Sequence, residues 1–354
     1  MKLSGKILAC LSVCFLFAGT ACGNGGQSGG REESGGTETG YREVLTDPTF
    51  ANGFNISNLK SGEVGGTWWK YSSTADASVQ PSWDLAQYCD LSSTRYRLGG
   101  DGTVAWRYDS SVNDISLATM FEEGKGIEGE EGDYFTLTNR SGSKLIKCDN
   151  KKGELILQAD TSKEYLDEQG KISPRKQGED WLHMVLGQSA GNTNVAACSE
   201  IRVQMEFTID HDDLISSEGG ASQFQWIFSV KDLDSAIGDY FWFNITLYDN
   251  RYADRVFPGT SMYDGGKADS TGKYIYAPSG DKVFGGKTEY GKKYAIDLDI
   301  RPLLEEAFLS AKEKGALKES AFESMALNSM NIGWEVTNVS DVCVTIGNLG
   351  LKVK

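Results

Sequence analysis

The sequence contains only two histidines, His183 and His211, in 354 residues. Two imidazoles cannot build a multi-histidine metal centre, and no nucleophile elbow accompanies them to support Ser-His-Asp catalysis. We therefore expect no cofactor and no catalytic metal. A structural calcium ion remains compatible with the sequence, because oxygen ligands could come from Asp249, Asp264 or Asp269.

Positive charge is also scarce. Fifty Asp and Glu residues outnumber 35 Lys and Arg residues, which gives a formal net charge of −15. An acidic surface repels phosphate backbones, so nucleic acid is not an expected partner, and the same charge disfavours polyuronate substrates. Beyond the N-terminal segment, no apolar run approaches the roughly 20 residues of a membrane helix. With 39% hydrophobic residues, the chain can still bury a large core.

The N-terminal segment has the layout of an export signal. Lys2 and Lys6 precede an apolar run at 7–18, and small residues at 19–21 lead directly to Cys22. The segment resembles a bacterial lipoprotein signal. That resemblance implies cleavage before Cys22, a lipid such as palmitate on this residue, and an extracytoplasmic position on the cell membrane, facing the surface. An ordinary secretory peptide cut after residue 21 is the alternative.

A segment without any apolar residue follows at 23–40. Its Gly-rich composition is typical of a flexible tether with a root-mean-square reach of roughly 25 Å. We therefore divide the chain into a signal peptide (1–21), a lipidated cysteine with its linker (22–40) and one globular domain (41–354).

Four cysteines remain in the globular domain, at Cys89, Cys148, Cys198 and Cys343. Their wide and irregular spacing excludes a zinc ribbon or a redox pair. Cys148 and Cys343 lie in alternating, strand-like sequence, where buried free thiols are the expectation, and three disulfide pairings stay open.

Most of the domain consists of short strand-like segments separated by turns. Two of them, 145–149 and 154–159, form a predicted hairpin. Further strands are predicted at 181–186, 201–209, 223–230, 240–248, 293–300, 330–336 and 342–353. One helix is predicted at 302–316, where proline suits the first turn and apolar residues form one stripe. This pattern indicates an all-β jelly-roll sandwich with one short helix. We expect 51–133 to form long loops over one end.

The strand at 240–248 carries the sharpest functional signal. Side chains alternate between the two faces of a strand, so its Phe, Ile and Leu residues share the core face. The other face then mixes aromatic rings with amide and hydroxyl groups. Sugars need this mixture, because their C–H faces stack on rings and their hydroxyls bond planar polar groups. The alternative is a face packed under a loop, with its polar groups satisfied locally.

Neighbouring strands divide in the same way. We therefore expect one sheet face to gather a ligand-binding set, consisting of Trp181, His183, Gln225, Tyr240, Trp242, Asn244, Tyr248 and Glu335.

Three segments, 178–188, 239–251 and 331–351, resemble concanavalin A-like sandwich proteins. This group includes lectins, carbohydrate-binding modules, laminarinase-type glucanases and alginate-lyase-type enzymes. The likeness spans roughly 140–354 and lies in the strand pattern. It implies the jelly-roll fold and a concave carbohydrate-binding face, but no particular activity.

Catalysis would place specific demands on this face. A retaining glycosidase needs two carboxylates about 5 Å apart, and the E-x-D-x-x-E signature of laminarinase-type enzymes is absent. Glu335 is the carboxylate expected on the polar face. A lyase-like site would pair His183 with Tyr240 or Tyr248, although the arginine-rich strand of such enzymes is missing. If the protein is an enzyme, Glu335 and His183 are the expected catalytic residues.

Three hypotheses follow. The first is a lipid-anchored surface protein that captures a poly- or oligosaccharide without cleaving it. The second is a glycan-cleaving enzyme, a glycoside hydrolase before a polysaccharide lyase. The third is a structural or protein-binding surface lipoprotein. The sequence leaves the glycan and the oligomeric state open.

Overall fold

The computed structural model describes residues 40–52, 54–58, 63–69, 82–88, 97–98, 103–104, 134–138, 143–149, 152–167, 169–176, 181–265 and 270–354. The predicted signal peptide, Cys22 and nearly all of the tether lie outside these ranges, as do Cys89 and Asp269. None of the helices in the described ranges has the length and apolar character needed to span a membrane.

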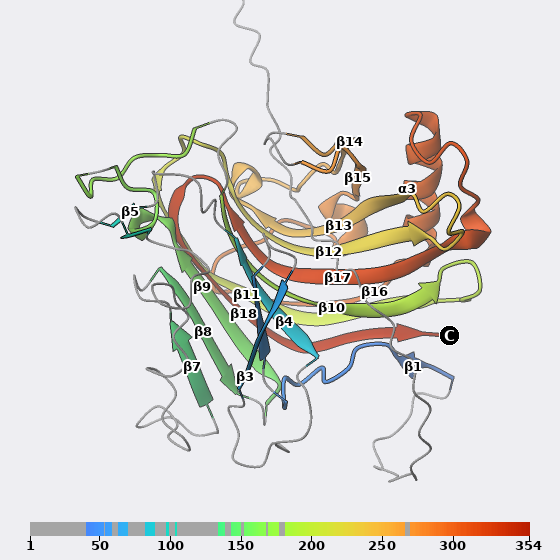
Figure 1. The fold of residues 1–354 in the computed structure, drawn as a ribbon, viewed down its shortest axis with the longest axis horizontal. Helices are drawn as coiled ribbons and strands as arrows, with labels where there is room; N and C mark the ends of the chain where they lie inside the picture. Colours follow the sequence, from blue (N-terminus) through green and yellow to red (C-terminus); the bar gives the residue numbers. More distant parts are fainter. Residues whose placement is uncertain are drawn as a thin grey trace, which may run out of the picture.

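Two β-sheets packed face to face form the body of the molecule (Figure 1). The nine-stranded sheet, here the large sheet, runs in the spatial order β14 (Thr260–Tyr263), β15 (Tyr274–Ala277), β13 (Tyr240–Asp249), β12 (Ser222–Asp232), β17 (Met325–Val336), β10 (Leu182–Asn194), β4 (Trp83–Tyr88), β2 (Phe54–Asn58) and β3 (Glu63–Trp69). Its neighbours pair antiparallel, except that β13 with β15 and β2 with β4 are parallel.

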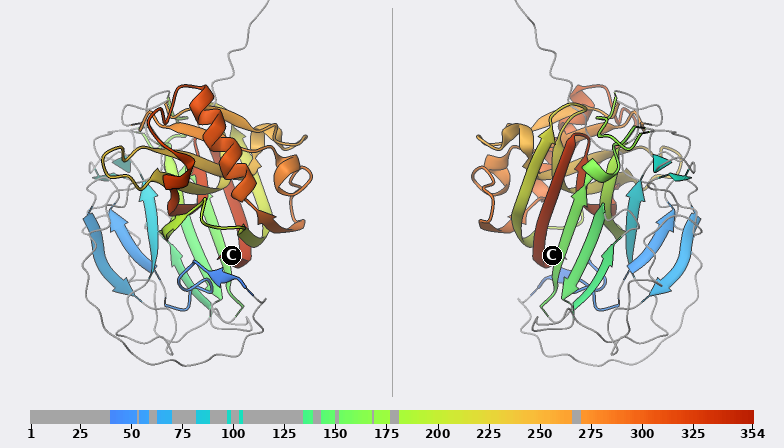
Figure 2. Two further views of the ribbon diagram at one scale, coloured as in Figure 1. Left: turned by 90° about the vertical axis from the view of Figure 1, so that its right-hand side faces the viewer. Right: turned by 90° about the vertical axis from the view of Figure 1, so that its left-hand side faces the viewer.

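The seven-stranded sheet, here the small sheet, has the order β16 (Lys293–Asp299), β11 (Ile201–Ser216), β18 (Val339–Val353), β9 (Glu154–Asp160), β8 (Lys144–Asp149) and β7 (Tyr134–Thr138). A short strand, β1 (Arg42–Glu43), also pairs with β18, near the C-terminus (Figure 2). Strands β5 (Arg97–Leu98) and β6 (Thr103–Val104) form a separate pair. The fold is thus the predicted all-β jelly-roll sandwich.

The core lies between the inner faces of the two sheets. Phe207 of the small sheet and Phe224 of the large sheet have ring centroids 6.2 Å apart. The indole nitrogen of Trp334 crosses the interface and donates to the Leu157 carbonyl at 3.0 Å. Burial of such large side chains supplies the main driving force for sheet packing.

Helix α3 (Arg301–Glu313) confirms the predicted helix, with proline in its first turn. Its stripe of Leu304, Ala307, Phe308 and Ala311 is buried. Tyr274 of β15 hydrogen-bonds Ser310 at 2.6 Å, which ties the helix to the large sheet. The described residues also contain a four-residue helix, α2 (Gly280–Val283), which is too short to produce an apolar period in the sequence. Short 3₁₀ turns are present at η3 (Thr161–Lys163), η4 (Asn250–Tyr252) and η5 (Phe322–Ser324).

The prediction of long loops at 51–133 is wrong for β2, β3 and β4, which extend the large sheet. Strand β4 pairs with β10, nearly 100 residues later, and β2 pairs parallel with β4. Pairing between such distant segments leaves little local signal, and the glycines and serines there weaken the strand pattern. Trp83 anchors β4, because its side chain is buried and its indole donates to the Asp47 carbonyl at 2.7 Å.

Three of the four domain cysteines fall in the described residues, and all three are free thiols. Cys148 and Cys343 are buried, as expected, and Cys198 is half-buried.

Candidate functional site

The large sheet carries a line of polar side chains on its outer face, the face turned away from the small sheet. The line crosses four neighbouring strands and consists of His183 on β10, Glu335 on β17, Gln225 on β12 and Asn244 on β13. We call these four residues the polar row. Their neighbours along each strand, such as Met184 and Trp334, point into the core. The row therefore follows from alternation along the strands and from strand order across the sheet.

Contacts run along the whole polar row. His183 Nε2 lies 3.3 Å from Glu335 Oε1, and the two residues are directly paired across β10 and β17. Gln225 Nε2 lies 3.5 Å from Glu335 Oε2. Asn244 Nδ2 donates to Gln225 Oε1 at 3.3 Å. Each of the four side chains is at most 2% exposed, so these interactions act in a low-dielectric environment.

The contact between His183 and Glu335 joins an imidazole to a carboxyl group. His183 Nδ1 lies 3.1 Å from the Trp181 carbonyl oxygen, and His183 Nε2 lies 3.3 Å from Glu335 Oε1. The imidazole is therefore held between a backbone carbonyl and a carboxyl group, in a buried environment.

Trp181 fixes the imidazole from the other side. It immediately precedes β10, and its ring stacks on that of His183 with centroids 5.4 Å apart and an interplanar angle of 27°. The Arg175 guanidinium lies 4.7 Å from the centre of the Trp181 ring, a cation–π distance. All three side chains are buried. Trp181 thus lies beside the polar row, and its ring holds the His183 imidazole in place by stacking on it.

Tyr240 and Trp242 lie on the outer face, but neither presents an open ring. Trp242 is 1% exposed and packs with Tyr240, Ile227 and Ile275, and its indole nitrogen donates to Thr271 Oγ1 at 3.3 Å. Tyr240 lies 4.9 Å from the ammonium of Lys273. Neither ring is open in this arrangement, and stacking of sugars on these two residues stays a prediction. Their cover comes from β15 and its flanking loop, about 30 residues later, which the sequence of β13 alone does not reveal.

Tyr248 does not share this face. The register between β12 and β13 shifts so that Phe224 pairs with Tyr248 and Gln225 pairs with Thr246, which leaves Leu247 as an extra residue, a β-bulge. After the bulge the alternation reverses, and Tyr248 turns inward. Its ring packs edge-on against Trp334, with centroids 6.0 Å apart. The prediction that Tyr248 binds ligand beside Trp242 is wrong for this reason.

The inward rotation of Tyr248 creates a polar cluster that the sequence did not predict. The Tyr248 hydroxyl donates to Asp212 Oδ2 of the small sheet at 2.7 Å. Asp212 also accepts from Ser222 and Ser340. Burial raises the pKa of the Asp212 carboxyl above its ordinary value, although these hydroxyl donors oppose the shift. Burial likewise raises the pKa of the Tyr248 phenol, and the negative charge of Asp212 adds to the effect.

The carboxylates considered for calcium have protein partners instead. Asp249 accepts from the Arg251 backbone and guanidinium and from Gln223 Nε2 at 2.5–3.0 Å. Asp264 accepts from the backbone and hydroxyl of Thr271. Asp269 lies outside the described residues. Within the described ranges, no three His, Cys, Asp or Glu side chains are arranged to hold a metal ion.

His211 lies far from the polar row. It belongs to β11 of the small sheet, pairs with Cys343 and contacts Asp341 Oδ1 at 3.4 Å. The strand predicted at 201–209 is longer in the structure, because β11 includes His211 and continues to Ser216.

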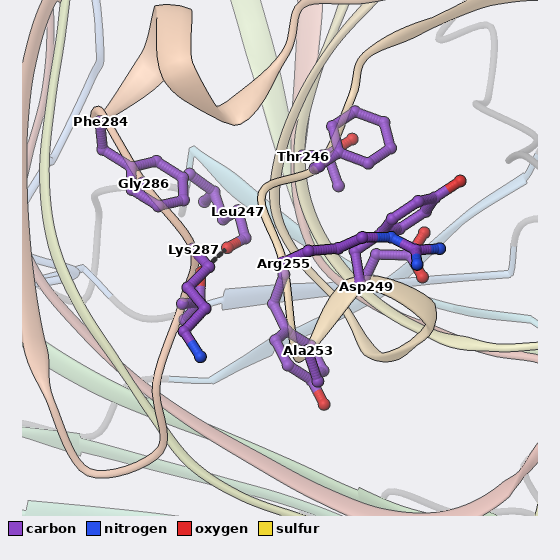
Figure 3. A pocket seen from close by; sticks show the side chains of 12 residues that line it. Thr246, Leu247, Asp249, Ala253, Arg255, Phe284, Gly286 and Lys287 are labelled. Carbon is purple, nitrogen blue, oxygen red and sulfur yellow. Dashed lines mark hydrogen bonds between the residues drawn. The ribbon is translucent and has the colours of Figure 1, made fainter.

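A pocket opens at the end of β13, beyond the short stretch that pairs with β15 (Figure 3). Its enclosed space is about 20 Å³, and the wider hollow around it is open to solvent. One wall carries Thr246, Asp249 and Arg255, and the facing wall carries Phe284, Gly286 and Lys287. Thr288 Oγ1 spans the base of the pocket and donates to the carbonyl of the bulge residue Leu247 at 2.6 Å. We call this feature the edge pocket.

No protein-family model matches this chain, and no curated protein matches its sequence. Among solved structures, the chain is similar to a native family 12 xyloglucanase from Bacillus licheniformis, with a TM-score of 0.36 and 11% identity over 65% of this chain and 90% of that chain. It is also similar to endoglucanase cel12A from Rhodothermus marinus (TM-score 0.35, 11% identity, 63% and 92% covered). A third similar structure is a family 11 xylanase from Neocallimastix patriciarum. Its TM-score is 0.35 and its sequence identity 7%, over 62% of this chain and 90% of that chain. The fold class follows from the chain's own two sheets, independently of these similarities.

Proposed function

We propose that the protein is a glycan-cleaving enzyme whose site is the polar row. The observation that carries this proposal is the buried contact between His183 Nε2 and Glu335 Oε1 at 3.3 Å. Cleavage of a glycosidic bond requires a group that gives a proton to the leaving oxygen and later recovers one. A buried carboxyl whose neighbour can hold the same proton can perform both steps.

The roles of the polar row follow from its contacts. Glu335 is the proposed proton donor to the glycosidic oxygen as the bond between that oxygen and the anomeric carbon breaks. A water molecule supplies the oxygen that bonds the anomeric carbon, and the proton that it releases returns to Glu335 through His183. Gln225 and Asn244 are the proposed ligands of sugar hydroxyls, because amides both donate and accept. Asn244 Oδ1 is buried and has no hydrogen-bond partner among the described residues, so it is available to accept from a hydroxyl. A ligand reaches this row only when the side chains covering it move aside.

The proposal includes the location of the enzyme. Acylation of Cys22 would place the domain on the cell surface, at the end of the tether, where polysaccharides are the accessible polymers. A carbohydrate partner and a membrane anchor are therefore parts of one hypothesis.

The first test incubates the soluble domain, residues 41–354, with a panel of plant, host and bacterial polysaccharides. Products are measured as new reducing ends and as unsaturated uronates. We expect release from at least one polymer and a loss of about 100-fold or more in Glu335→Gln and His183→Ala. Glu206→Gln and His211→Ala are matched controls on the small sheet, and both should keep wild-type activity. No product from any polymer would contradict the proposal.

Capture without cleavage is the second candidate, and Asp249 favours it. A retaining or inverting hydrolase uses a pair of carboxylates. Asp249 also lies on the outer face, and Gln223 stands between it and Glu335 in the register of β13, β12 and β17. Its oxygens are nevertheless occupied by Arg251 and Gln223. Binding of a polysaccharide in affinity gels, weakened by Asn244→Ala but without any product, would establish capture.

A further inference from the structure

The edge pocket contains a buried hydroxyl without a partner. Thr246 is 2% exposed, and its Oγ1 makes no hydrogen bond within the described part of the chain. A buried polar group left unpaired costs free energy, on the order of 1–3 kcal/mol. Such a group is therefore retained more readily where a ligand can bond to it. Thr246 is one of the residues that line the edge pocket.

The charge around the edge pocket is opposite to that of the whole chain. Asp249 is neutralised by the Arg251 guanidinium at 2.5 Å. Two further cations, Arg255 and Lys287, line the pocket, and neither forms an ion pair among the residues that the structure describes. In Figure 3 the Arg255 guanidinium reaches over the side of the pocket near Asp249, whereas the Lys287 ammonium extends away from it. The pocket thus has a net positive charge in a protein of net charge −15.

The orientation of the Arg255 guanidinium is partly fixed. It lies 5.2 Å from the centre of the Tyr252 ring, a cation–π contact. Tyr252 in turn packs edge-on against Phe257, with ring centroids 5.3 Å apart. A guanidinium held over a ring keeps its donors in one plane, the geometry that suits carboxylate and sulfate oxygens.

We propose that the edge pocket binds an acidic substituent of the glycan, either a uronic acid carboxylate or a sulfate ester. The Arg255 guanidinium forms an ion pair with the anionic group, and the Thr246 hydroxyl donates a hydrogen bond to a neighbouring oxygen of the ligand. This inference rests on the proposed glycan substrate, but it does not require that the glycan be cleaved.

The register connects the edge pocket to the polar row. Asp249 pairs with Gln223, and Gln223 pairs with Glu335, so the pocket lies two strand spacings from Glu335, about 10 Å along the sheet. Thr246 pairs with Gln225 of the polar row. One oligosaccharide running across the strands would therefore place its acidic unit in the pocket and an adjoining linkage at the row.

The test compares acidic oligosaccharides with neutral counterparts of the same backbone. The probes are oligogalacturonates and their carboxyl-reduced forms, and sulfated oligosaccharides and their desulfated forms. Dissociation constants are measured by calorimetry on the soluble domain carrying Glu335→Gln, so that no probe is consumed. We expect at least one acidic probe to bind about tenfold more tightly than its neutral counterpart. The pair that shows the difference distinguishes carboxylate from sulfate.

Arg255→Ala should remove this preference while leaving affinity for the neutral probe unchanged, and Arg255→Lys should restore only part of it. Thr246→Val should weaken the same acidic probe. Lys318→Ala, which removes an exposed cation outside the pocket, is the matched control and should retain the full preference. Equal affinity for acidic and neutral probes, or a preference that survives Arg255→Ala, would overturn the inference. Loss of the preference in Arg255→Ala, together with no product from the domain that keeps Glu335, would uphold this inference and reject cleavage alone.

Discussion

Gly333, on β17 between Asn331 and Glu335, occupies a position with no room for a side chain. An added Cβ would lie 2.1 Å from the Met184 carbonyl oxygen and 2.7 Å from the Val185 Cα, both on the neighbouring strand β10. Its φ of +154° is also one that residues with side chains rarely adopt. Close approach of the two backbones here supports the direct pairing of His183 with Glu335, two residues further along.

Gly333→Ala should therefore lower the free energy of unfolding by about 3 kcal/mol, because β10 or β17 must shift to relieve the overlap. The measurement is equilibrium unfolding in urea. Gly286→Ala is the matched control, since nothing lies within 4 Å of a Cβ added there, and we expect a change within about 0.5 kcal/mol. An equally small effect at Gly333 would show that the close approach is not rigid.

At the scale of the element, β13 shows how far the sequence predicts this structure. Its alternation correctly placed Phe241, Phe243 and Ile245 in the core and Asn244 on the opposite face. Leu247 is also in the core, as predicted, and the prediction fails at Tyr248. The bulge that turns Tyr248 inward depends on the partner strand and on Thr288, which hydrogen-bonds the carbonyl of Leu247. Neither is visible in the nine residues of the pattern.

The other elements show the same difference between local sequence patterns, which predict structure, and contacts with distant segments, which do not. Strands β8, β9 and β12 and helix α3 fall close to their predicted positions, since each has a strong local period. The polar row can be predicted from the sequence because four strands repeat one alternating pattern. The side chains that cover Trp242 and the edge pocket cannot be predicted in this way, because both depend on the positions of loops from distant segments.

The contact between Tyr248 of β13 and Asp212 of β11 should make the stability of the folded protein depend on pH. Burial raises the pKa of Asp212 in the folded state. Between the ordinary and the raised value the folded protein keeps a proton that the unfolded chain has lost, so its stability falls as pH rises through this interval. Asp212→Asn cannot ionise and should flatten this dependence. Melting temperatures recorded from pH 3 to 7 for both proteins test this. An unchanged slope in the variant would assign the dependence to other groups.

At the scale of the whole molecule, the predicted lipoprotein signal would determine where the domain acts. If Cys22 carries a lipid, the full chain should fractionate with membranes and incorporate labelled palmitate when expressed in a bacterial host. Cys22→Ala should lose the label and leave the membrane fraction. Cys10→Ala removes a cysteine within the predicted signal and serves as the control. Release of the unmodified chain into the medium would instead support an ordinary secretory peptide.

The polar row has a consequence for how ligand affinity responds to ionic strength. Its proposed sugar ligands, Gln225 and Asn244, are uncharged amides, so hydrogen bonds that they make to sugar hydroxyls change little when salt is added. Contacts made at Arg255 are between unlike charges near the surface and are screened over about 10 Å at 0.1 M salt. A single oligosaccharide that bridges both places would thus be held by one salt-sensitive end and one salt-insensitive end. A salt titration alone would then separate the two contributions.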